Sequence, residues 1–139
     1  MYKKILHGLD GSDGSLKALR VAMDLAHGSG ADLHTISVEE IPHYPGAIGE
    51  VIEEKAAANG TFQVALEHAR ELTAQKGIQL RSHVIVGHEV KSIVEFIKQE
   101  RFDLLVIGFM GHSALYNRIM GSTCQNLVRL SPCSVLVVK

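Results

Sequence analysis

The sequence predicts an α/β protein: a single doubly wound, five-stranded parallel sheet with helices on both faces. Apolar segments of strand length alternate with segments of helical periodicity along the 139 residues, and such alternation is typical of right-handed βαβ crossovers. The uninterrupted apolar run Leu104–Ile107 indicates a strand that is covered on both faces. No repeat, linker or low-complexity tract interrupts the pattern, so residues 1–139 are expected to form one domain.

The N-terminal third of the chain predicts a strand, a helix and a second strand. Lys4–Leu9 is strand-like, and helical periodicity begins at Leu16, after a turn whose Ser12 or Asp13 can cap the helix. The features that follow are a helix stop at Gly28 and Gly30, the strand Leu33–Val38, and the proline- and glycine-containing loop Glu39–Gly49.

The rest of the chain predicts three more strands separated by helices. A helical pattern is clearest from Phe62 to Leu72 and is ended by Gly77, and the alternating segment Ile78–Val86 is typical of a strand with one exposed face. The last elements are a short helix over Val90–Ile97, the strand Leu104–Ile107, a helix over Ser122–Leu130 that Pro132 breaks, and a fifth strand Val135–Val138.

Composition argues against several classes of protein. Fourteen Lys and Arg residues balance fifteen Asp and Glu residues, without the basic excess typical of nucleic-acid-binding proteins. The apolar runs fall well short of the ~18 residues of a membrane-spanning helix, and the residues after Met1 do not resemble a secretory signal. The two cysteines, Cys124 and Cys133, suit a reducing compartment. We therefore expect a cytoplasmic protein that binds neither nucleic acid nor membrane.

Glycines gather in the loops after the first and fourth predicted strands. Open parallel sheets bind ligands beyond the carboxyl ends of such strands, where the strand order reverses. The second loop has Gly108 and Gly111, then nine residues, then Gly121-Ser122-Thr123 at the start of a helix. Glycines let the backbone approach an anion, and a helix N-terminus directs N–H groups at it, so phosphate is the expected guest. Turn geometry alone remains the alternative for scattered glycines.

Two common phosphate-binding motifs do not fit this chain. A Walker A loop needs a lysine, and none lies between Gly108 and Gly121. The dinucleotide fingerprint would follow the first strand, where the spacing of Gly8, Gly11 and Gly14 misses it.

The pattern Gly108-x2-Gly111-x9-Gly121-Ser122, followed by Pro132–Val138, resembles the nucleotide-binding signature of the universal stress protein family. Residues 3–6 and 9–12 are similar to the opening strand and loop of that family, and the resemblance spans essentially all of the chain. It implies the strand order 3-2-1-4-5, with ATP or AMP across strands 1 and 4. It also implies a homodimer through Val135–Val138, and an apolar edge strand of this kind favours pairing with another chain.

The resemblance also implies roles for single residues. Asp10 matches the acidic position near adenine and ribose, and the backbone of Val38 matches the adenine contact. From its position alone, Asp10 could orient ribose, help hold a Mg²⁺ or Mn²⁺ ion bound by the phosphates of ATP, or serve only as a carboxylate in the first turn of a helix. His7-Gly8 departs from the apolar residues common at those positions. The candidate nucleotide-binding residues are Asp10, Gly11, Ser12, Val38, Gly108, Met110, Gly111, His112, Gly121, Ser122, Thr123 and Cys124.

The expected function is therefore a nucleotide-binding regulatory dimer with an unidentified protein partner and no assigned catalytic residue. One alternative is a slow ATPase or phosphoryl-transfer enzyme, in which Asp10 acts through a metal and Arg118 reaches over the loop. The other is a nucleotide-free adaptor dimer.

Two further patterns admit more than one interpretation. His7, His34 and His83 lie on neighbouring strands and could form a metal cluster, although buried or rim histidines are the default. Cys124 lies in the first turn of a helix, where a thiol pKa can fall, or is simply a buried residue of the helix face.

Overall fold

The computed structural model describes residues 1–40, 62–109 and 121–139. Five parallel strands form one sheet of order β3-β2-β1-β4-β5, which confirms the predicted topology. The strands are β1 (Lys4–Gly8), β2 (Asp32–Glu40), β3 (Leu80–Gly87), β4 (Leu104–Gly108) and β5 (Ser134–Val138). The helices are α1 (Asp13–Ser29), α3 (Gln63–Gln75), α4 (Glu89–Glu100) and α5 (Ser122–Leu130). Among these described helices, none combines the length and apolar character needed to cross a membrane.

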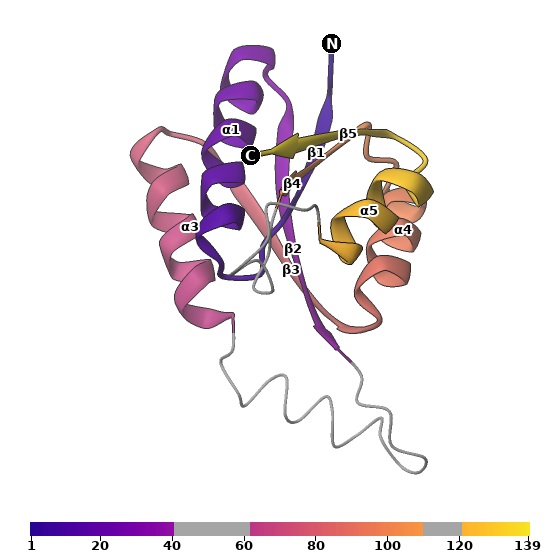
Figure 1. Ribbon diagram of the computed structural model, residues 1–139. Helices are drawn as coiled ribbons and strands as arrows, with labels where there is room; N and C mark the ends of the chain where they lie inside the picture. The colour runs from indigo at the N-terminus through magenta and orange to yellow at the C-terminus, as the bar shows by residue number, and fades with distance from the viewer. Residues whose placement is uncertain (41–61, 110–120) are drawn as a thin grey trace.

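Helices cover both faces of the sheet (Figure 1), so the predicted double winding is confirmed: of the described helices, α1 and α3 pack on one face and α4 and α5 on the other. Alternate strand residues point to opposite faces, and accordingly Ile5 and Leu33 join the α1–α3 cluster while Leu6 and Ile36 join the α4–α5 cluster. Every residue from Leu104 to Ile107 is buried, as the apolar run predicted.

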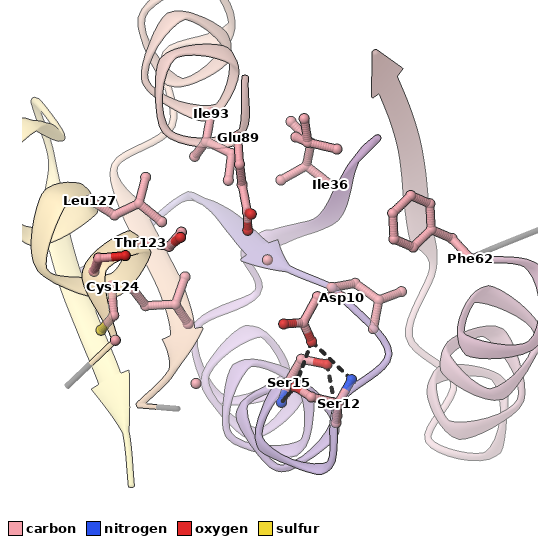
Figure 2. Close-up of a pocket in the computed structure, with 17 residues that line it drawn as sticks. Asp10, Ser12, Ser15, Ile36, Phe62, Glu89, Ile93, Thr123, Cys124 and Leu127 are labelled. Atoms are coloured by element: carbon pink, nitrogen blue, oxygen red, sulfur yellow. Dashed lines mark hydrogen bonds between the residues drawn. The ribbon is translucent and has the colours of Figure 1, made fainter. Parts of the chain in front are cut away.

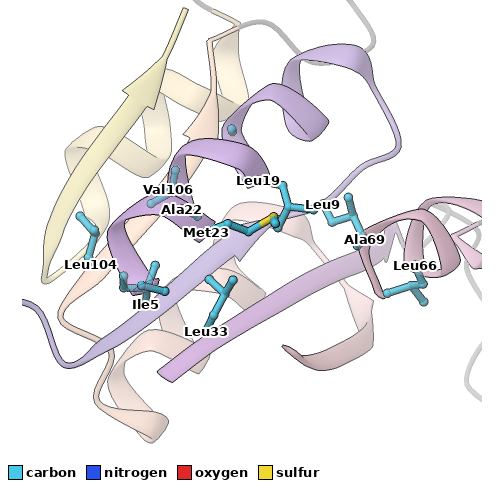
Figure 3. Packing of buried hydrophobic residues seen from close by; sticks show 12 residues of the cluster. Ile5, Leu9, Leu19, Ala22, Met23, Leu33, Leu66, Ala69, Leu104 and Val106 are labelled. Atoms are coloured by element: carbon cyan, nitrogen blue, oxygen red, sulfur yellow. The ribbon is translucent and has the colours of Figure 1, made fainter. Parts of the chain in front are cut away.

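The α1–α3 cluster shows how the core holds a helix on the sheet (Figure 3). Leu19 and Met23 of α1 are at most 1% exposed and lie over Ile5 and Leu33 of the central strands. Full burial of such side chains contributes about 1.5–3 kcal/mol each to folding. This packing fixes the start of α1, which borders the carboxyl end of β1.

Helix α1 is capped at both ends. The Ser12 hydroxyl accepts a hydrogen bond from the Ser15 backbone N–H at 3.1 Å, which satisfies one of the unpaired N–H groups at the helix start. Gly30 ends the helix with φ of 70°, a left-handed conformation that favours glycine. Ser12 is one of the two capping residues that the sequence suggested. The helix begins at Asp13, three residues before Leu16, where the helical pattern of apolar residues starts.

Strand β2 continues past the predicted end at Val38. Glu40 still pairs with Gly87 of β3, and its carboxylate Oε2 accepts a hydrogen bond from the Glu89 backbone N–H at 3.0 Å. This contact ties β2 to the start of α4. The predicted loop Glu39–Gly49 therefore begins inside a strand, and its remainder lies outside the described residues.

Strand β3 differs from the expected single exposed face. Leu80 packs against the α1–α3 cluster and Ile85 against the α4–α5 cluster, so helices contact both faces. Val84 is 48% exposed because β3 is an edge strand and its faces are only partly covered.

Candidate functional site

A cavity of about 380 Å³ lies at the carboxyl ends of β1, β2 and β4, within the usual size range of small-molecule sites. It occupies the point where strand order reverses, because β1 connects to β2 on one side and pairs with β4 on the other. The predicted residues that line it are Asp10, Ser12, Val38, Gly108, Gly121, Ser122, Thr123 and Cys124. Gly11 is not among the lining residues, and Met110, Gly111 and His112 lie outside the described part of the chain.

All four described helices begin at this cavity: Ser12 precedes α1, Phe62 precedes α3, Glu89 opens α4, and Gly121 precedes α5. One backbone N–H group at the start of α1, that of Ser15, donates to the Ser12 side chain, and one at the start of α4, that of Glu89, donates to the Glu40 side chain. Gly121 has no side chain to cap α5, and Ser122 and Thr123 lie inside that helix. The start of α5 therefore presents backbone N–H groups and two hydroxyls to the cavity, a combination that suits an anion.

Asp10 stands between the two ends of the cavity (Figure 2). Its Oδ1 accepts hydrogen bonds from the backbone N–H of Ser12, at 2.9 Å, and from the Ser12 hydroxyl. Because that hydroxyl also accepts from the Ser15 N–H, one chain of hydrogen bonds joins the carboxylate to the first turn of α1. A carboxylate held in this way can accept hydrogen bonds from ribose hydroxyls or contact a cation.

The side of the cavity formed by α4 and α5 combines the apolar side chains of Ile93 and Leu127 with polar groups, whereas the side of Phe62 is mainly apolar (Figure 2). Thr123 and Cys124 of α5 face it from one side and Phe62 from the other (Figure 2). Leu9 and Val38 add apolar side chains to the lining. A ligand with a planar apolar part and a charged part would match this division.

Gly108 has a structural role that sequence reasoning did not find. A Cβ atom at this position would lie 2.8 Å from the backbone carbon and oxygen of Gly14 and 3.2 Å from the Ser15 nitrogen. The first turn of α1 therefore packs directly on the end of β4, and only glycine fits there. Gly121 is different, because a Cβ there would meet no atom of the described part of the chain within 4 Å.

The family model described as "Universal stress protein family" matches residues 1–139. The chain belongs to this family. Universal stress protein MJ0531 of Methanocaldococcus jannaschii is 31% identical, over 100% of this chain and 83% of the relative. YxiE of Bacillus subtilis is also 31% identical, over 100% of both proteins. A universal stress protein solved in complex with cAMP is 30% identical, with a TM-score of 0.75 over 99% of this chain and 97% of that one.

In this universal stress protein, His7 lies in the core next to the cavity and holds the first turn of α1. The ring is fully buried, and its Nε2 donates to the carbonyl of Ser15 at 2.7 Å, while Nδ1 lies 3.1 Å from the Thr35 hydroxyl. Burial lowers the pKa of His7 from 6.5 to about 4, although the Ser15 carbonyl and Asp10 partly oppose that shift. His7 is therefore neutral at pH 7 and holds α1 by hydrogen bonds.

His7 does not join a metal cluster with His34 and His83, because His34 faces the opposite side of the sheet. His34 Nδ1 and His83 Nε2 are 2.9 Å apart, and the rings contact Phe102 and Phe96 respectively. Burial lowers the pKa of both histidines, that of His34 to about 4. Within the described ranges, no group of three or more His, Cys, Asp or Glu residues could hold a metal ion.

Cys124 fits the second of its two interpretations. Its side chain is buried in the α4–α5 cluster, and burial raises the pKa of the thiol. The lining residues that sequence reasoning missed include Phe62 and Glu89, each at the start of a helix. The residue pattern offered no signal for Glu89, whereas an aromatic residue opening a helix beyond the end of a strand could have suggested Phe62.

Proposed function

We propose that this universal stress protein binds an adenine nucleotide, ATP or AMP, in the cavity and acts as a cytoplasmic regulatory homodimer. The observation that carries the proposal is the division of the cavity into an apolar side, a carboxylate and the N–H groups at the start of α5. A nucleotide has base, ribose and phosphate in the same order. The free thiols of Cys124 and Cys133 agree with a reducing compartment.

The relative solved with cAMP supports an adenine nucleotide as the ligand, since it shares 30% identity across nearly the whole chain. With ATP, a Mg²⁺ or Mn²⁺ ion bound by the phosphates would lie near Asp10. Glu89 brings a second carboxylate, besides that of Asp10, to the cavity lining. The presence of this second carboxylate favours slow ATP hydrolysis as the second candidate function. Release of inorganic phosphate from ATP, measured with and without Mg²⁺, distinguishes this enzyme from a regulatory binder.

Gly121→Val is expected to weaken nucleotide binding at least tenfold while leaving the melting temperature close to that of the wild type. A Cβ at this position meets no atom of the described residues within 4 Å, so the new side chain would extend into the space in which the phosphate would approach the N–H groups of α5. Isothermal calorimetry with ATP and AMP measures the effect. Gly28→Val, at an open position of α1 remote from the cavity lining, is the matched control and should bind normally.

Mass spectrometry of small molecules released from the denatured wild-type protein identifies the nucleotide it carries. Wild-type protein that carries no adenine nucleotide and binds none in calorimetry would overturn the proposal and favour the nucleotide-free adaptor. Unchanged nucleotide affinity in Gly121→Val would instead mean that the start of α5 does not bind the phosphate.

The proposed dimer rests on the edge position of β5. Residues 135–138 are all apolar and only partly buried, and Val128 and Leu130 of α5 are 44% and 55% exposed. A second copy pairing along β5 would cover this strand and satisfy its outer backbone groups.

Val137→Lys is expected to convert a dimer to a monomer, because a charge on an edge strand opposes pairing with another strand. Light scattering after size-exclusion chromatography gives the mass of each species. Val84→Lys places the same charge on the other edge strand, β3, where Val84 is 48% exposed, and this variant should remain dimeric. A monomeric wild type, or dissociation by Val84→Lys alone, would contradict pairing through β5.

A further inference from the structure

Phe62 contributes the aromatic ring to the described lining of the cavity. The residue is partly buried and packs against the α1–α3 cluster, and Figure 2 shows its ring on the opposite side of the cavity from Thr123 and Cys124. The other large apolar residues toward the ends of β1 and β2 are aliphatic, among them Leu9 and Val38. A flat aromatic surface in this position differs from them because it offers a face on which a planar ring can stack.

The start of α3 is held close to the turn that carries Asp10. The Leu66 backbone N–H donates to the Phe62 carbonyl at 2.8 Å, so Phe62 belongs to the first turn of α3. A Cβ placed on Gly11 would lie 3.7 Å from the Cβ of Ala65, which is ordinary van der Waals contact between the two segments. The ring of Phe62 and the carboxylate of Asp10 are thus positioned by neighbouring, packed backbone.

We propose that Phe62 is the base-stacking residue of the cavity, so that a purine base lies against its ring while the phosphate meets the start of α5. The inference rests on the proposed nucleotide-binding function and adds the residue that recognises the base. It makes the site sensitive to the nucleobase as well as to the phosphate, since stacking on an aromatic side chain strengthens binding of each base by roughly tenfold or more.

Calorimetry with two probes separates the base from the rest of the nucleotide: AMP, and ribose 5-phosphate, which lacks the base. Phe62→Leu keeps an apolar side chain of similar size but removes the flat face, so it should weaken AMP about tenfold and leave ribose 5-phosphate unchanged. Leu72→Ala is the control for lost packing, because Leu72 packs against the same cluster without lining the cavity. This control should lower the melting temperature without changing the affinity for AMP.

Phe62→Trp provides a second readout that does not depend on loss of binding. The chain contains no tryptophan, so the new indole is the single tryptophan fluorophore, and a stacked base should quench it on addition of AMP but not of ribose 5-phosphate. AMP binding by Phe62→Leu at wild-type affinity, or equal weakening of both probes, would overturn the role of Phe62 while leaving the proposed function intact. Wild-type protein that binds neither of these probes nor ATP would overturn both.

Discussion

Gly108→Ala is expected to lower the free energy of unfolding by about 3 kcal/mol and the melting temperature by roughly 10 °C. The added methyl group would lie 2.8 Å from the backbone of Gly14, closer than Cβ atoms approach other atoms in folded proteins. A flexible side chain could rotate away from such a contact, but backbone in the first turn of a capped helix cannot. Relief therefore requires α1 to move off β4, which disturbs the buried cluster beneath it.

Thermal and urea unfolding measure this loss, and Gly121→Ala is the matched control. Both glycines line the same cavity, but a Cβ at position 121 meets no atom of residues 1–40, 62–109 or 121–139 within 4 Å, so that variant should unfold within about 0.5 kcal/mol of the wild type. Equal stability of the two variants would contradict the close packing of α1 on β4.

The buried His7 is expected to make the protein lose about 3 kcal/mol of stability between pH 7 and pH 4. Its pKa is 6.5 in a solvated chain and about 4 in the fold, so the unfolded state binds more protons over this interval. Stability is therefore complete above pH 6.5 and falls as the pH drops through 6.5 toward 4. The lowered pKa values of His34 and His83 add to the loss in the same direction.

His7→Gln should remove about 3 kcal/mol of this pH dependence, because a glutamine amide can still donate to the Ser15 carbonyl but does not titrate in this range. Urea unfolding at several pH values between 4 and 7 gives the slope for each variant. The control His27→Gln changes an exposed histidine of α1 and should retain the wild-type slope. A slope for His7→Gln equal to that of the wild type would mean that His7 does not titrate with unfolding.

The fold was predictable because its signals are local. The apolar run Leu104–Ile107 and the helix over Ser122–Leu130 occur where the periodicity placed them. Boundaries set by distant contacts were not predictable. Strand β2 extends to Glu40 because that residue pairs with Gly87 and caps α4, and both partners lie more than forty residues away in the sequence.

The site was predictable where a residue follows a strand or opens a helix in the glycine pattern, as Asp10 and Gly121 do. Phe62 and Glu89 reach the cavity from elements outside that pattern, and their approach depends on how α3 and α4 pack. Whether the histidines share a face of the sheet depends on the strand register. His7 pairs with Thr35 in the sheet, so the adjacent His34 points to the other face. A shift of one residue in register would have reversed this result.

The first turn of α1 limits how related sequences can diverge. Ser12 caps that helix and also holds Asp10, and Gly108 touches its backbone, so a change at any of these positions alters the fold together with the cavity. Val38 and Phe62 line the cavity outside this turn, at the end of β2 and the start of α3, and pack at the margins of the two core clusters. We expect descendants of this chain to acquire new ligand preferences at Val38 and Phe62, because drift in the first turn of α1 is removed as misfolded protein before a new preference can arise.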